Sequence, residues 1–73
     1  MSSEEVRAIR AKTKLSRANF ARRFGFDEKT VRRWETGDKE PHAHNAVLLT
    51  LIDRFPETCN RVAAELLRAR SRP

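Results

Sequence analysis

Apolar residues recur along the chain at spacings of three and four, the period of an α-helix, and no segment alternates as a strand would. Two glycines and three prolines fall between the apolar stretches, where helices would end. We therefore expect an all-α fold, a compact bundle of about five short helices. The expected helices cover Ser3–Thr13, residues 17–24 after Ser16, residues 28–36 after Asp27, residues 43–55, and a last stretch from Pro56.

The expected helix ends coincide with residues that suit such positions. Ser2 and Glu5 have the spacing of a capping box. Asp27 is a good N-cap, and Gly25 suits the left-handed position just past a helix end. Pro56 is tolerated in the first turn of a helix. The sequence therefore favours helices with defined boundaries.

Each expected helix carries apolar residues suited to burial. In chain order they are Val6, Ile9, Phe20, Ala21, Phe24, Val31, Trp34, Val47, Leu48, Leu51, Ile52, Phe55, Cys59, Val62, Ala63, Leu66 and Leu67. The stripe on the last helix suits either the intramolecular core or a dimer interface, and we expect it to serve both, shared with the preceding helix. The residues predicted for a dimer interface are Leu51, Phe55, Cys59, Val62 and Leu66.

The net charge of the chain limits the kinds of partner that it is expected to bind. Sixteen lysines and arginines oppose ten aspartates and glutamates, for a net charge of +6. A domain this basic attracts polyanions, either nucleic acid or an anionic membrane. The membrane is the weaker alternative, because the apolar stretch 46–52 is far too short to span a bilayer. We expect a cytoplasmic, nucleoid-associated protein. The acidic start MSSEE lacks a secretory signal, and the single Cys59 fits a reducing compartment.

Residues 17–36 have the pattern of a helix-turn-helix, in which two helices cross steeply through a short turn. Ala21 is the small residue needed at the crossing, Gly25 permits a positive φ, and Phe26 fills the corner. Two apolar anchors one turn apart then hold the second helix. The expected structural core of the unit is Phe20, Ala21, Phe24, Gly25, Phe26, Val31 and Trp34.

The second helix of this unit is expected to read DNA, since its N-terminal part enters the major groove in such proteins. Lys29 and Arg33 can donate to guanine, Thr30 can approach a thymine methyl, and Glu28 can accept from cytosine N4. The predicted base contacts are Arg17, Glu28, Lys29, Thr30, Arg32 and Arg33.

Phosphate contacts are expected around the same unit. Ser16 and Arg17 begin the first helix, whose N-terminal amides suit a backbone phosphate. The predicted phosphate contacts are Lys14, Ser16, Arg17, Arg22, Arg23, Thr36 and Lys39. The alternative for the arginine pairs 22–23 and 32–33 is a solvated helix face. The C-terminal Arg68, Arg70 and Arg72 suit either an arm on the DNA backbone or a solvated tail.

The run LSRANFARRFGFDEKTVRRWETGDKEP resembles the XRE (Cro/C1-type repressor) helix-turn-helix family, and within it the small HigA-type antitoxins. The resemblance extends over about Val6–Pro56. It implies a five-helix, lambda-repressor-like fold, a homodimer on an inverted-repeat operator, and autoregulation. Arg17 stands where the family commonly carries a DNA-contacting glutamine, so the base preference does not transfer.

We expect one domain over residues 1–70. Within it, residues 17–36 form the helix-turn-helix unit, residues 43–69 supply core and dimer contacts, and residues 71–73 form a frayed basic tail. The expected function is a homodimeric autorepressor that binds palindromic double-stranded DNA. The alternatives are an antitoxin that also neutralises a protein toxin, or a controller protein of a phage, mobile element or restriction-modification system.

Enzymatic activity is not expected, because the sequence has no phosphate-binding glycine loop, catalytic triad or metal-ligand cluster. His42 and His44 are two residues apart, and a helix would splay them, so we expect neither a metal site nor a cofactor. RNA suits the motif less well than DNA, since the major groove of an A-form helix is too narrow for side chains to read.

Overall fold

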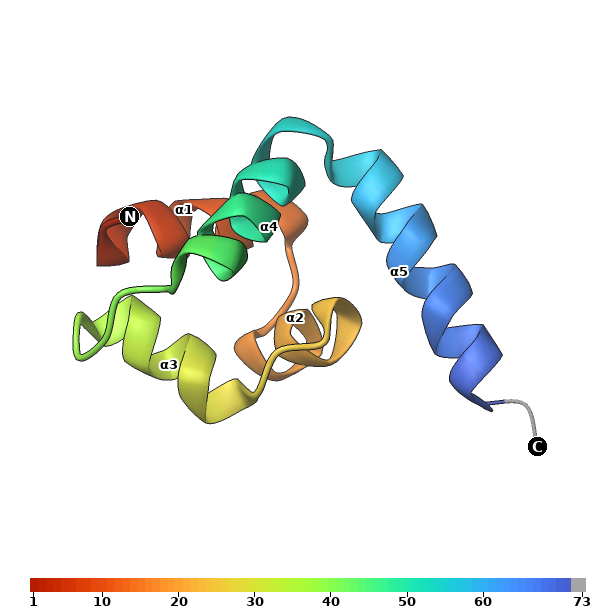
Figure 1. Ribbon diagram of the computed structural model, residues 1–73, viewed down its shortest axis with the longest axis horizontal. Coiled ribbons are helices and arrows are strands. Elements are labelled where there is room, and N and C mark those ends of the chain that lie inside the picture. The colour runs from red at the N-terminus through yellow and green to blue at the C-terminus, as the bar shows by residue number, and fades with distance from the viewer. Residues whose placement is uncertain (72–73) are drawn as a thin grey trace.

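The computed structural model describes residues 1–71, with side chains up to residue 70. This part of the chain folds into α-helices without a strand, as predicted (Figure 1). The helices are α1 (Ser3–Thr13), α2 (Arg17–Phe24), α3 (Glu28–Thr36), α4 (Ala43–Arg54) and α5 (Pro56–Ser71). Ser71, the first residue of the tail expected at 71–73, is the last residue of α5. Arg72 and Pro73 lie outside the described residues.

Helices α1, α2 and α3 begin at the predicted caps. The Ser2 hydroxyl accepts from the Glu5 amide and the Glu5 carboxylate accepts from the Ser2 amide, both at 3.1 Å, which completes the capping box. Ser16 and Asp27 cap α2 and α3 by accepting from amides three residues further on, at 3.1 and 3.3 Å. The left-handed residues that follow α1, α2 and α3 are Lys14, Gly25 and Gly37.

The buried core joins α1, α2, α3 and α4. Its members are Val6, Ile9, Phe20, Ala21, Val31, Trp34, Leu49 and Ile52. The Phe26 ring stacks on Phe20 with centroids 5.9 Å apart and meets Trp34 edge-on at 5.1 Å. Phe26 therefore fills the corner between α2 and α3, and Trp34 is a core residue that is unavailable for stacking on a base.

Helix α4 buries a residue that the sequence pattern did not single out. Leu49 is fully buried, and Ile52 lies beside it in the core. Val47, Leu51 and Phe55 instead point outward, with 60%, 43% and 56% of their surfaces exposed. Periodicity could not separate the two sides, because α4 carries apolar residues on both.

Helix α5 packs on α2 and α4 and lies at one end of the molecule (Figure 1). Ala63 faces inward, Cys59 is half-buried against the core, and Val62 and Leu66 are exposed. The stripe predicted on this helix is thus divided between the core and the surface. No helix of the described residues has the length and apolar character needed to cross a bilayer.

Candidate nucleic-acid interface

Helix α3 is fixed by its apolar side and presents a charged one. Val31 is fully buried and Trp34 is 3% exposed, so the opposite side of the helix must face solvent. The exposed residues on α3 are Glu28, Lys29, Arg32, Arg33 and Thr36. The structure thus brings Glu28, Lys29, Arg32 and Arg33 to the exposed, mainly cationic side of α3, whereas the predicted contact Thr30 is half-buried. The width of an α-helix suits the major groove of B-DNA.

Two threonines of α3 are held by local hydrogen bonds. The Thr30 amide and hydroxyl lie 3.3 and 3.4 Å from the capping carboxylate of Asp27, and Thr30 is half-buried. The Thr36 hydroxyl donates to the Arg33 carbonyl at 3.2 Å. Both hydroxyl groups therefore stabilise the ends of α3, and DNA contact would have to compete with these bonds or use the remaining lone pairs.

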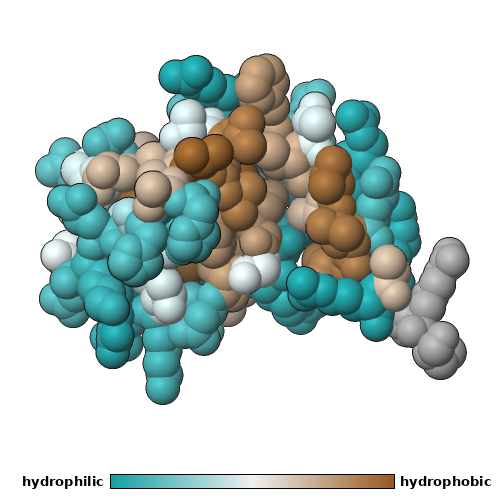
Figure 2. All heavy atoms as spheres, viewed as in Figure 1, coloured by the Kyte–Doolittle hydropathy of each residue, from teal (hydrophilic) through white to brown (hydrophobic). Residues whose placement is uncertain are grey.

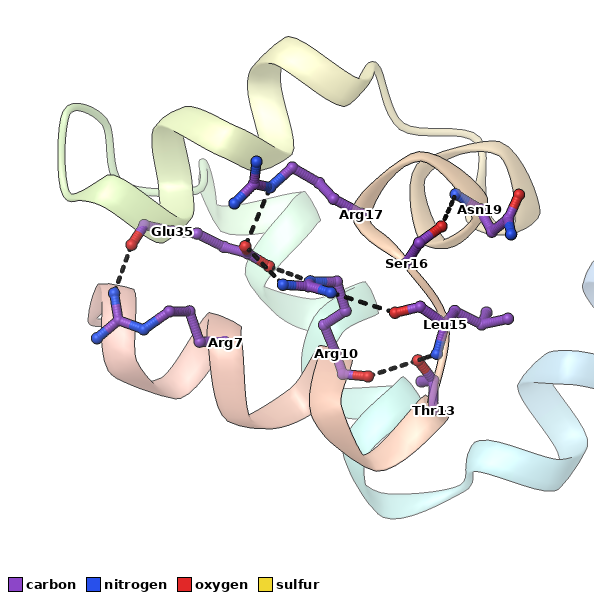
Figure 3. Close-up of polar contacts among 8 residues, drawn as sticks. All are labelled: Arg7, Arg10, Thr13, Leu15, Ser16, Arg17, Asn19 and Glu35. Carbon is purple, nitrogen blue, oxygen red and sulfur yellow. Dashed lines mark hydrogen bonds and ion pairs between the residues drawn. The ribbon is translucent and has the colours of Figure 1, made fainter.

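Arg17 reaches from α2 to a buried carboxylate that sequence analysis missed. The Glu35 side chain is 1% exposed, and its Oε1 accepts from Arg17 Nε at 3.2 Å and from Arg10 Nη2 at 3.1 Å. Its Oε2 accepts from Arg10 Nε at 2.6 Å (Figure 3). The Glu35 carbonyl also accepts from Arg7. One residue of α3 thereby joins α1 and α2.

The protonation of Glu35 follows from its partners. Burial alone would raise the pKa of this carboxyl, but the hydrogen bonds and charges of Arg10 and Arg17 outweigh burial and hold the pKa below its ordinary 4.5. The hydrogen bond to Glu35 in turn raises the pKa of Arg10. Because two guanidinium groups share one carboxylate, the cluster keeps an uncompensated positive charge.

A sequence signal for Glu35 did exist. Glu35 lies four residues after Val31 and one after Trp34, so helical periodicity puts it on the buried side of α3. A carboxylate at such a position requires cationic partners, because burying an unpaired charge is costly. The sequence could not indicate which of its sixteen basic residues supply them.

Three of the predicted phosphate contacts line polar hollows, in two different places. Lys39 lines a polar hollow with Arg33 and Thr30, next to the exposed side of α3. Arg22 and Arg23 instead line a hollow on the side of α2 that faces α5. Arg23 Nη1 also donates to the Asn60 side chain at 3.1 Å. Lys39 therefore lies next to α3, whereas Arg22 and Arg23 lie on the side of α2 that faces α5.

Other candidate chemistry is sparse. The His42 and His44 rings stack with centroids 6.2 Å apart. Within residues 1–71, histidine, cysteine, aspartate and glutamate side chains form no group of three that could hold a metal ion.

The large apolar residues that the described chain leaves exposed all lie on or next to α4 and α5. They are Val47, Leu51, Phe55, Val62 and Leu66. Figure 2 shows apolar side chains on both sides of a furrow between these helices. An apolar groove of about 320 Å³ lies there, with Leu48 and Leu51 on one wall and Ala63 and Leu66 on the other. Exposed apolar surface gathered in this way is typical of an interface.

Comparison with known proteins agrees with this geometry. Residues 6–51 match the family model described as Helix-turn-helix. The chain is also 35% identical over 63 residues to a protein of Vibrio cholerae serotype O1 named Antitoxin HigA-2. The match covers 86% of this chain and 61% of that protein, so the chain spans about three fifths of its relative's length.

Proposed function

The chain belongs to the XRE-type helix-turn-helix family, whose members bind DNA, and on that premise we propose that it is a sequence-specific transcriptional regulator that reads the major groove with α3. The observation that carries this proposal is the two-sided character of α3. Val31 and Trp34 fix the helix from beneath, while its cationic side stands free of the protein. A rigid helix with exposed cations can dock without first having to order itself.

The proposed reading residues divide the work between affinity and selectivity. Lys29 and Arg33 donate to guanine O6 and N7, and Glu28 accepts from cytosine N4. Arg32 and Thr30 complete the set of base contacts. Contacts to backbone phosphates contribute most of the affinity and none of the sequence information. The proposed phosphate-binding residues are Lys14, Ser16, Arg17, Thr36 and Lys39. Arg22 and Arg23 have a weaker claim, because they face α5.

We further propose that the regulator is a homodimer that represses its own operon. The exposed apolar residues on or next to α4 and α5 support a symmetric interface on that side; they include Leu51, Phe55, Val62 and Leu66. A two-fold dimer would carry two copies of α3 and would match an inverted repeat with half-sites about 34 Å apart. Cys59 is half-buried and contributes less to such an interface than its neighbours.

The first test asks whether α3 reads sequence. Lys29→Ala and Arg33→Ala are combined, and binding is measured to a duplex that the wild-type chain selects from a randomised library and to a scrambled duplex. We expect the preference for the selected duplex to fall by about 2 kcal/mol or more, since each bidentate base contact contributes about 1–3 kcal/mol of discrimination. The control pairs Arg61→Ala with Arg68→Ala on exposed positions of α5, which removes the same charge.

The control should weaken binding to both duplexes alike, through charge alone. If the Lys29/Arg33 double variant keeps full discrimination, α3 is not the reading helix. If the wild-type chain selects no preferred duplex at all, the protein is not a sequence-specific regulator.

A second candidate function is neutralisation of a protein toxin. The similarity to a protein named Antitoxin HigA-2 supports it. A gene for a small toxin beside the gene for this chain would favour this function, whereas phage, mobile-element or restriction-modification neighbours would favour a controller protein. The direct test is co-expression with the product of the neighbouring gene. An antitoxin restores growth and co-purifies with that product, and a pure regulator does neither.

A further inference from the structure

Arg17 is attached to the protein by only part of its guanidinium group. Its Nε donates to Glu35 Oε1 at 3.2 Å, and its side chain is 36% exposed. Its two terminal nitrogens make no hydrogen bond within the described residues, and in Figure 3 they carry no dashed line. An arginine has five N–H donors, so four of those on Arg17 remain available for a ligand.

Arg10 is used differently, although it binds the same carboxylate. Its Nε and Nη2 both donate to Glu35, and its Nη1 donates to the Leu15 carbonyl at 3.2 Å. Arg10 is thus engaged through all three nitrogens and serves the fold. Arg17 is engaged through one nitrogen, which fixes its direction without using its terminal donors.

The position of Arg17 makes these donors suitable for a phosphate. Arg17 is the first residue of α2, directly after the cap Ser16, so it stands beside the free amides of that helix N-terminus. Glu35 lies near the end of α3, so the contact places the guanidinium between α2 and α3. The surplus positive charge of the Arg10–Glu35–Arg17 cluster adds to the attraction for an anion.

We propose that Glu35 is a positioning residue for DNA binding: it holds Arg17 by Nε and thereby presents the terminal N–H groups of Arg17 to a DNA backbone phosphate. The inference rests on the proposed regulatory function. It assigns Arg17 to phosphate rather than base contact, because a side chain tied back to a buried carboxylate at 3.2 Å has little length left to enter the groove. It also requires arginine at position 17, since lysine has a single nitrogen that cannot bind Glu35 and a phosphate in this arrangement.

The decisive variants are Arg17→Lys and Arg17→Ala, both at a partly exposed position where the fold should be retained. Binding is measured over a range of salt concentrations with the duplex selected by the wild-type chain. We expect Arg17→Ala to weaken binding about tenfold, as for the loss of one hydrogen bond to a charged group. The slope of log K against log salt should fall by about 0.9, the value for one phosphate contact.

Arg17→Lys should behave almost like Arg17→Ala, because Glu35 holds its single ammonium nitrogen and no second nitrogen is left to reach the phosphate. If Arg17 acted only as a point charge, Arg17→Lys would keep the affinity and the salt slope of the wild-type chain. That result would overturn the proposal.

Glu35→Gln supplies an independent test, because the proposal and the change in net charge predict opposite changes in DNA affinity. The substitution raises the net charge above +6, which by itself favours binding to DNA. The proposal nevertheless expects weaker binding, because the glutamine amide is uncharged and offers one acceptor oxygen where the carboxylate offers two, so Arg17 is held less firmly. Glu57→Gln, at an exposed position on α5, adds the same charge without touching the cluster, and it should bind at least as tightly as the wild-type chain.

Affinities are compared at a temperature at which circular dichroism shows that each variant is folded. The double variant Glu35→Gln/Arg17→Ala then separates an effect on the position of Arg17 from an effect on stability. In the Glu35→Gln background, Arg17→Ala should cost less than about twofold in affinity, whereas independent effects would multiply to the full loss. Full multiplication overturns the inference. The proposed function fails separately, if the wild-type chain selects no duplex at all.

Discussion

At the scale of single residues, Glu35 has the largest structural consequence. Its carboxylate is buried and accepts three hydrogen bonds from α1 and α2, and its carbonyl accepts another from Arg7. Removing it would leave the guanidinium groups of Arg10 and Arg17 without their acceptor. A buried ion pair is costly to break from one side, because the remaining charge is left uncompensated.

Glu35 should therefore make the stability of the protein depend on pH. Its pKa is lowered in the folded state, so the carboxylate contributes stability above the unfolded value near 4.5 and loses that contribution as the pH falls through this value toward the folded pKa. Urea unfolding at pH 7 and at steps down to pH 3 measures this loss. Glu35→Gln should be destabilised by about 2–4 kcal/mol at pH 7 and should lose less on acidification.

The comparison between the two chains is needed because Glu35 is not alone. The pKa of Glu5 is also lowered, by the hydrogen bonds to its cap partner Ser2, and this effect is present in both chains. The contribution of Glu35 is therefore measured by the difference between the two chains in how much stability they lose on acidification. Parallel pH profiles for the wild-type chain and Glu35→Gln would contradict the assignment.

At the scale of the helices, the boundaries could be predicted from sequence because they depend on local chemistry. Ser2, Ser16 and Asp27 cap α1, α2 and α3 in the structure as their spacing indicated. The partners of α4 could not be predicted in this way. Leu49 and Leu51 are both apolar, yet only Leu49 is buried, and this choice depends on where the other helices pack.

The same limit applies to the candidate interface. The exposed face of α3 followed from the period of the helix, since Val31 and Trp34 fixed the buried side. The contacts of Arg17 with Glu35 and of Arg23 with Asn60 join residues 18 and 37 positions apart. Nothing in a single sequence selects those pairs from the many possible ones, so tertiary contacts rather than local pattern decided them.

The turn between α2 and α3 yields a prediction at this scale. Gly25 has φ of +78°, a left-handed conformation, and an added Cβ would have no heavy atom within 4 Å. Gly25→Ala should therefore destabilise the protein by about 1 kcal/mol through backbone strain alone. Thermal or urea unfolding measures the change.

Gly25→Asn supplies the matched comparison, because asparagine tolerates the left-handed region better than alanine. We expect it to be the more stable of the two variants. A larger loss for asparagine than for alanine would mean that steric contact in the turn, rather than φ, sets the cost.

At the scale of the whole molecule, the two surfaces proposed for DNA binding and for dimerisation are separate. Figure 1 shows α3 and α5 toward opposite ends of the long axis, along which the molecule extends 38 Å. The charged surface lies on α3, and the exposed apolar residues lie on or beside α4 and α5. A second copy could therefore cover the apolar side while leaving α3 free. That arrangement would hold two reading helices apart, as an operator with two half-sites requires.

The dimer proposal predicts a defined response to charge on the apolar side. Leu66 is 59% exposed, so Leu66→Glu should leave the monomer folded while placing a carboxylate inside the proposed interface. We expect dimerisation to weaken about tenfold or more, measured by analytical ultracentrifugation over a concentration series.

Binding to a selected duplex with two half-sites should weaken more than binding to a single half-site, because the variant loses the second reading helix but keeps the first. Ala11→Glu, at an exposed position of α1, is the matched control and should retain the wild-type mass. An unchanged mass for Leu66→Glu would place any dimer interface elsewhere, and the apolar side of α4 and α5 would then need another partner.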